Sequence, residues 1–109
     1  MIARTWSGRT RREHADAYVD YILRTGVKDA RATEGNRGVL FLRRDGEAET
    51  EFTFISLWGS LADVVGFAGA DVTRARYYPA DRVYLLDMPE RVEHQEVAVD
   101  AREEAHANG

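Results

Sequence analysis

The feature that most constrains the fold is a pair of β-rich runs, 37–44 and 50–58, joined by Asp45-Gly46. An Asp-Gly pair between two such runs is typical of a hairpin turn. In the second run, large apolar side chains alternate between the two faces: Phe52, Phe54 and Trp58 against Ile55 and Leu57. A strand with one solvated face would carry polar residues at every second position. Both faces of this hairpin are therefore expected to be covered.

The segment before the hairpin predicts one strand and one helix. The first nine residues alternate in polarity, which predicts a strand ended by Gly8. Thr10 and Glu13 have the spacing of a capping box, in which hydroxyl and carboxylate satisfy the first amides of a helix. A helix is therefore expected to begin at Thr10 and to fray or end near Gly26.

The segment after the hairpin predicts a shorter helix and a last strand. Ser60 and Asp63 repeat the capping pattern, and Gly69 marks the expected end of that helix. Residues 71–78 are expected to add a short helical turn before a proline breaks it, and 91–99 reads as a strand.

This element order, strand-helix-strand-strand-helix-strand, predicts an α+β, ferredoxin-like fold with a four-stranded antiparallel sheet and both helices on one face. Helices on one face would leave several large side chains in water on the other, at about 1.5–3 kcal/mol each. A homodimer packed sheet against sheet is the economical solution, and a C-terminal segment folded back as a lid is the alternative. A chain of 109 residues fits one domain, expected over 1–99, followed by a flexible acidic tail, 100–109.

Composition narrows the classes of partner. The chain has 15 Lys and Arg against 19 Asp and Glu, so its net charge of −4 disfavours nucleic acid and anionic membranes as partners. Because there is no cysteine, disulfides, thiolate metal sites and a cysteine nucleophile are excluded. The start of the chain has neither a signal-peptide pattern nor a long apolar span, which together with the absence of cysteine predicts a cytoplasmic protein.

Nucleotide-binding, hydrolase and zinc-protease motifs are all missing from the sequence, so no cofactor is expected. His94 and Glu96 share a strand face, but a metal site needs at least one more ligand nearby, so no metal is expected. A neutral His94 imidazole could serve as a general base near pH 7, and a structural histidine with satisfied hydrogen bonds is the alternative.

Aromatic side chains supply the main clue to a ligand. Trp58 closes the third strand just before the Gly59-Ser60 helix start, at the mouth of any gap between sheet and helices. Six further side chains are expected to line that gap: Arg4, Trp6, Tyr18, Phe54, Phe67 and Tyr77. Such a cluster forms either plain core or a cleft that stacks a flat apolar ligand. Arg4, once buried, needs a counter-ion, either a ligand carboxylate or enolate or a protein carboxylate such as Asp63 or Glu96.

Four segments resemble the antibiotic biosynthesis monooxygenase family: Met1-Ile2-Ala3-Arg4-Thr5-Trp6, Gly35-Asn36-Arg37-Gly38-Val39, Ser56-Leu57-Trp58-Gly59-Ser60 and Arg91-Val92-Glu93-His94. The likeness spans roughly residues 1–99. It implies a dimeric α/β barrel, in which two ferredoxin-like protomers pack their sheets together. The family includes cofactor-free oxygenases of aromatic polyketides, haem-degrading enzymes and members with no known reaction.

The resemblance implies a cofactor-independent monooxygenase of secondary metabolism that uses dioxygen on a small phenolic or polycyclic aromatic compound. Trp58 matches the pocket tryptophan of the oxygenase and haem-degrading branches and would stack the ring, with His94 as base and Arg4 or Tyr77 stabilising negative charge. The asparagine and histidine of the haem-degrading branch are replaced here by Arg4-Thr5-Trp6 and Arg74-Ala75-Arg76. The alternatives are a non-catalytic dimeric binding or stress-associated module for a hydrophobic metabolite, and a haem-handling protein.

Overall fold

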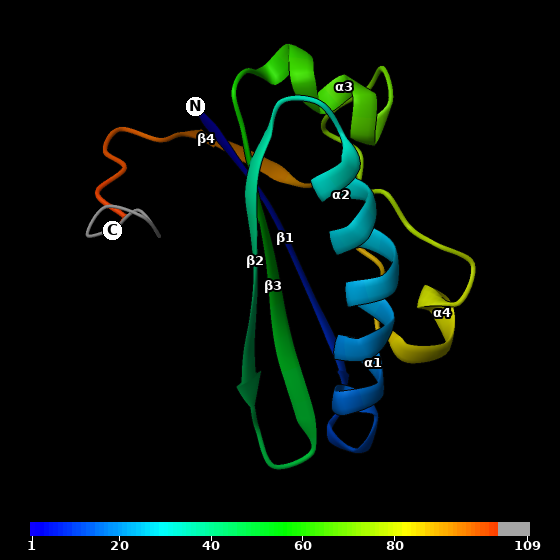
Figure 1. The fold of residues 1–109 in the computed structure, drawn as a ribbon. Helices are drawn as coiled ribbons and strands as arrows, with labels where there is room; N and C mark the ends of the chain where they lie inside the picture. The colour runs from blue at the N-terminus through cyan, green and yellow to red at the C-terminus, as the bar shows by residue number, and fades with distance from the viewer. Residues whose placement is uncertain (103–109) are drawn as a thin grey trace.

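The computed structural model describes residues 1–102 and contains one antiparallel sheet with strand order β2-β3-β1-β4. The strands are β1 (Ile2–Arg11), β2 (Asn36–Asp45), β3 (Glu49–Trp58) and β4 (Glu93–Glu96). Helices lie on one face of this sheet, and residues 97–102, which follow β4, run on the other side (Figure 1). The predicted ferredoxin-like arrangement is confirmed, including the hairpin at Asp45-Gly46. The last residues of the predicted tail, 103–109, lie outside the described residues.

The helices fall into two groups. Between β1 and β2 the chain forms a 3-10 turn and then one long rod: η1 (Arg12–His14), α1 (Ala15–Ile22), the π-helical η2 (Leu23–Val27) and α2 (Lys28–Ala32). After β3 come α3 (Leu61–Ala68) and the single turn α4 (Asp81–Tyr84). None of the helices within residues 1–102 is long and apolar enough to cross a bilayer.

The sequence predicts that the first helix frays or ends at Gly26. The rod does not end there: it becomes π-helical in η2 around this residue and continues through α2. The reason is packing. A side chain at position 26 would place its Cβ 3.3 Å from the Phe54 ring of β3, so glycine here permits close approach of helix and sheet. This glycine therefore serves helix–sheet contact and does not terminate the helix.

The predicted cap at Thr10 is wrong, because β1 continues through Gly8 and Thr10 as far as Arg11. Its pairing with β3 runs without interruption from Ile2↔Trp58 to Arg11↔Glu49, and the Thr10 hydroxyl donates to the neighbouring Arg11 carbonyl. The second predicted cap is confirmed: the Ser60 hydroxyl accepts a hydrogen bond from the Asp63 amide, 3.3 Å away, at the start of α3.

In the last third of the chain, the structure has less helix and strand than the sequence predicts. Residues 71–78 form no helix, and α4 begins only after Pro79. The strand predicted over 91–99 shortens to β4, because the Val92 amide donates to the Thr73 carbonyl instead of to β1. At its other end β4 stops at Glu96, which pairs with Ile2, the first residue of β1, so no further strand is available to pair with.

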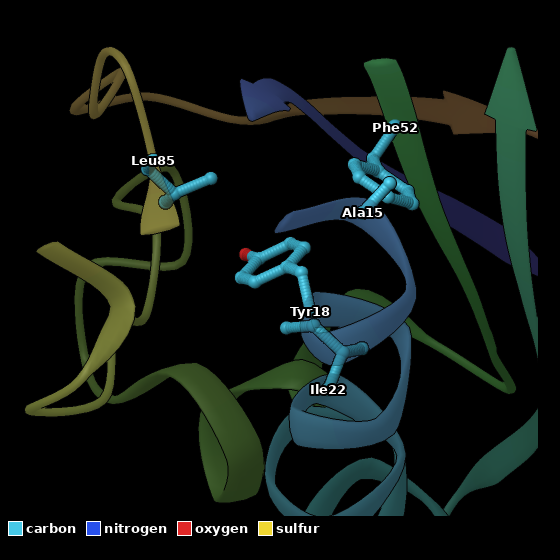
Figure 2. Packing of buried hydrophobic residues seen from close by; sticks show 5 residues of the cluster. All are labelled: Ala15, Tyr18, Ile22, Phe52 and Leu85. Atoms are coloured by element: carbon cyan, nitrogen blue, oxygen red, sulfur yellow. The ribbon is translucent and has the colours of Figure 1, made fainter. Parts of the chain in front are cut away.

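Two apolar clusters fill the space between the sheet and the helices. The first joins Ala15, Tyr18 and Ile22 of α1 to Phe52 and Leu85. Figure 2 shows the Tyr18 ring directed from α1 toward Leu85, while Phe52 projects from β3 toward Ala15. The second cluster joins α2, β3 and α3 through Ala30, Trp58, Val64 and Phe67.

The opposite face of the sheet carries a separate apolar strip. Leu40 is 51% exposed and Leu42 is 48% exposed, and Ile55 of β3 lies directly across from Leu40. Leu57, by contrast, is buried, and Arg102 of the C-terminal segment lies beside Gly38 next to it. Large apolar side chains on both faces of the hairpin are thus confirmed, and the strip of Leu40, Leu42 and Ile55 remains in contact with solvent.

Replacing Phe52 with alanine should lower the free energy of unfolding by about 3–5 kcal/mol, because the ring is buried against Tyr18 and Phe41. Urea unfolding monitored by circular dichroism would measure the loss. The control is Leu23→Ala, which removes a side chain that is 59% exposed and should change stability by no more than about 0.5 kcal/mol. Equal losses in the two variants would contradict this account of the core.

Candidate functional site

A cavity of about 50 Å³ lies between β1, β3, the α1–η2 rod and the loop before α4. All six side chains predicted to line a cleft line this cavity: Arg4, Trp6, Tyr18, Phe54, Phe67 and Tyr77. The structure adds two chemically distinctive residues that were not predicted, Arg76 and Asp81, and Tyr78 also lines the cavity. The cavity is therefore mostly aromatic, with two cations and one carboxylate in its wall.

Trp6 and Tyr77 form one wall of the cavity. The Trp6 indole folds over Gly8, where a Cβ would lie only 2.3 Å from the ring. Its Nε1–H donates to the Tyr77 hydroxyl at 3.0 Å, and that hydroxyl donates to the Pro89 carbonyl. The two rings meet edge to face with centroids 6.3 Å apart. Because each polar tip is satisfied, this wall presents chiefly apolar ring surface to the cavity.

Arg4 is a buried cation that has no counter-ion in the described part of the chain. Its side chain is 4% exposed, and Nη2 donates to the Arg74 carbonyl at 2.7 Å. No carboxylate of residues 1–102 forms an ion pair with it, so neither Asp63 nor Glu96 plays the counter-ion role considered from the sequence. Burial lowers the pKa of Arg4 to about 10, which leaves it charged at neutral pH.

Asp81 is the buried carboxylate of the cavity, with 2% of its surface exposed. One of its oxygens accepts from the Tyr18 hydroxyl at 3.2 Å, and the other accepts from the Tyr78 amide at 2.6 Å. Burial raises the pKa of Asp81, and these two hydrogen bonds oppose the rise. A carboxyl group with a raised pKa beside an aromatic cavity can act as a proton acceptor.

The second cation, Arg76, already has a carboxylate partner. It donates to the Phe67 carbonyl at 2.8 Å and to Asp29 of α2 at 3.2 Å, and its guanidinium lies over the Phe67 ring. The Tyr78 hydroxyl donates to the same Asp29 carboxylate at 2.6 Å. Asp29 thus ties the loop before α4 to the helical rod, and Arg76 needs nothing from a ligand.

The two residues predicted to be catalytic lie outside the cavity lining. Trp58 is fully buried behind it, where its ring packs on Phe67 and its Nε1–H donates to the Ser56 hydroxyl at 2.9 Å. His94 lies on β4 directly opposite Arg4, and burial together with the Arg4 charge lowers its pKa. The roles predicted for Trp58 and His94 stay predictions. Within residues 1–102, no three His, Asp or Glu side chains are grouped closely enough to hold a metal ion.

Comparison with known proteins gives a likeness of fold. No model of a known protein family matches the chain, and no curated protein matches it in sequence. Among solved structures it is similar to a Bacillus cereus protein provisionally assigned as an antibiotic biosynthesis monooxygenase. That similarity has a TM-score of 0.64 and 14% sequence identity, and covers 94% of this chain and 98% of the other. The fold is therefore that of an antibiotic biosynthesis monooxygenase-like protein.

Replacing Tyr18 with phenylalanine removes one hydrogen-bond donor to ionised Asp81 and should raise the pKa of Asp81 further. In the folded variant, Asp81 then stays protonated up to a higher pH than it does in the folded wild type. Its unfolding free energy should fall relative to wild type as pH rises from about 4 to 7, ending about 1–3 kcal/mol lower.

Urea unfolding at several pH values would measure this dependence. Tyr84→Phe is the matched control, because the Tyr84 ring packs on Tyr18 and its hydroxyl is no partner of Asp81. A difference between Tyr18→Phe and wild type that stays constant with pH would contradict the assignment.

Proposed function

We propose that this protein is a cofactor-independent monooxygenase-like enzyme that acts on a small phenolic compound. The observation that carries the proposal is one aromatic cavity that contains both a cation without a counter-ion among residues 1–102, Arg4, and a buried carboxylate, Asp81. The likeness of fold to a protein provisionally assigned as an antibiotic biosynthesis monooxygenase supports the same reaction class.

Cavity size favours a single aromatic ring over a polycyclic one. The volume is about 50 Å³, whereas an apolar cavity of about 150 Å³ is known to hold benzene. Substrate entry therefore requires one wall to move. We propose that residues 69–80 form the wall that moves. This described segment has no helix or strand, and the Arg76 and Tyr78 side chains attach it to the rod through hydrogen bonds to Asp29 that can break and re-form.

The substrate supplies the electrons for this reaction. Asp81 takes the phenol proton, and the Arg4 guanidinium stabilises the phenolate as charge moves into the ring. The ring carbon para to the hydroxyl gives electrons to dioxygen and forms a carbon–oxygen bond. The peroxide O–O bond then breaks, so one oxygen atom stays as the second quinone carbonyl and the other leaves as water with the two hydrogens that the phenol has lost. Phenol and dioxygen thus give quinone and water.

We also propose that a second copy of the chain covers the strip of Leu40, Leu42 and Ile55. These side chains face away from the helices and stay half exposed or partly exposed. A sheet of the same sequence, turned about a two-fold axis, would present the same strip and bury both. Among the described residues the C-terminal segment reaches Gly38 but leaves Leu40 and Leu42 exposed, which favours a second copy over a lid.

Oxygen uptake should accompany quinone formation when the purified protein is given an electron-rich single-ring phenol such as 2,6-dimethoxyphenol, with 1-naphthol and anthrone as the larger comparisons. Arg4→Gln and Asp81→Asn should each lower kcat/KM by about 100-fold, because one loses charge stabilisation and the other loses the proton acceptor. An oxygen electrode and absorbance spectroscopy would follow both products.

Arg24→Gln, an exposed change on the rod, is the control and should keep wild-type turnover. Trp58→Phe and His94→Ala test the two roles predicted from the sequence. Unchanged turnover in Arg4→Gln and Asp81→Asn would remove the proposed mechanism. Retention of phenol without oxygen uptake would favour the non-catalytic binding module, and a Soret shift on haem titration would favour haem handling.

Sedimentation equilibrium at micromolar concentration should give the mass of a dimer for the wild type and of a monomer for Leu42→Asp. The variant is expected to be monomeric because a dimer would bury the added carboxylate, without a partner, between the two sheets. Leu23→Asp places the same change at a similarly exposed leucine on the helical side and should leave the dimer intact. A monomeric wild type would refute the dimer.

A further inference from the structure

Two buried side-chain atoms within residues 1–102 lack any hydrogen-bond partner: Nε of Arg4 and Nε2 of His94. These residues face each other across the β1–β4 pairing, in the register Arg4↔His94. Their side chains therefore project from the same face of the sheet, the face that bounds the cavity. Buried polar atoms are nearly always paired in folded proteins, so two unpaired ones side by side indicate an absent partner.

We propose that Arg4 and His94 together bind the carboxylate of the ligand, which makes the substrate a phenolic carboxylic acid. The inference rests on the proposed function for the identity of the ligand body, an aromatic ring in the cavity. Arg4 Nε–H would donate to one carboxylate oxygen and His94 Nε2–H to the other. A planar group with two acceptor oxygens satisfies both orphaned atoms at once.

The positive charge of Arg4 favours an anionic ligand. Arg4 is positively charged, 4% exposed and without a carboxylate partner among the described residues. Burying a charge is costly unless it is paired, so an incoming monoanion supplies the partner that residues 1–102 do not. The guanidinium carbon also lies over the Phe67 ring, 5.8 Å from its centroid, so the charged group is in contact with the aromatic lining.

Comparison with Arg76 shows why the site is specific to Arg4. Both arginines line the cavity, but Arg76 is paired with Asp29 and with the Phe67 carbonyl. Asp81 is likewise engaged, by Tyr18 and Tyr78, and forms no ion pair with Arg4. Arg4 is thus available to hold the acid end of a ligand through Nε–H, and its positive charge still stabilises the phenolate of the same ring. Asp81 is left to accept the proton of the ligand's hydroxyl.

Titration calorimetry with 4-hydroxybenzoate and with its neutral isostere 4-hydroxybenzamide tests the site without turnover, because in both compounds the ring carbon para to the hydroxyl is blocked and no quinone can form. The wild type should bind the acid at least about 10-fold more tightly than the amide, because only the acid pairs with the cation. Arg4→Gln should abolish this preference, and Arg4→Lys, which keeps the charge but loses Nε–H, should reduce it. His94→Ala should weaken acid binding while amide binding changes little.

Nitrogen-15 NMR of the arginine side chains gives a second readout on the unmodified protein. The Arg4 Nε–H resonance should move on addition of 4-hydroxybenzoate and stay in place with 4-hydroxybenzamide. Arg24→Gln is the control variant and should bind as wild type. Equal affinities for acid and amide, no binding of either, or an unmoved Arg4 resonance would overturn the proposal and leave a buried water between the two nitrogens as the explanation.

The two proposals fail separately. Selective acid binding without oxygen uptake would keep the carboxylate site and reject the oxygenase. Oxygen uptake on neutral phenols, with wild-type affinities equal for acid and amide, would keep the oxygenase and reject the carboxylate site.

Discussion

The register of β1 against β3 and β4 is the constraint on which the site depends. Side chains alternate along a strand, so this register sends Arg4 and Trp6 toward the helices and sets Arg4 beside His94. A shift of the β1 register by one residue would turn the Arg4 guanidinium and the Trp6 indole to the opposite face of the sheet, and the cavity would lose both side chains. Continuous pairing with β3 over all ten residues of β1 makes such a slip costly.

The same long pairing explains where sequence reasoning about the fold succeeds and where it fails. The Asp45-Gly46 hairpin and the Ser60 cap follow from local chemistry, and both are present. Thr10 has equally good local chemistry for a cap, yet it lies in a strand because distant residues of β3 pair with it. Gly26 reads as a helix end, and only its contact with Phe54 shows that it serves packing. A local sequence pattern does not show whether contacts with distant residues will override it.

The cavity could be predicted in part for a related reason. Alternation in β1 and the abundance of aromatic residues were enough to find its six predicted side chains. Asp81 gave no signal, because Asp81-Arg82 reads as an ordinary solvated pair and its burial arises from the Tyr18 and Tyr78 contacts. Trp58 ends its strand as predicted, but it lies behind Phe67 and does not face the cavity. Sequence thus indicates which residues share a face, whereas depth within a layer depends on the packing of every neighbour.

The folding of Trp6 over Gly8 links two positions two residues apart in β1. The indole occupies the volume that any larger residue at position 8 would need, so the pair has a fixed combined size. Homologous chains should therefore vary at these positions in concert: a bulky residue at 6 accompanies glycine at 8, and a smaller one at 6 permits alanine or serine at 8. Such paired exchange would let evolution resize the aromatic chamber without altering the backbone of the sheet.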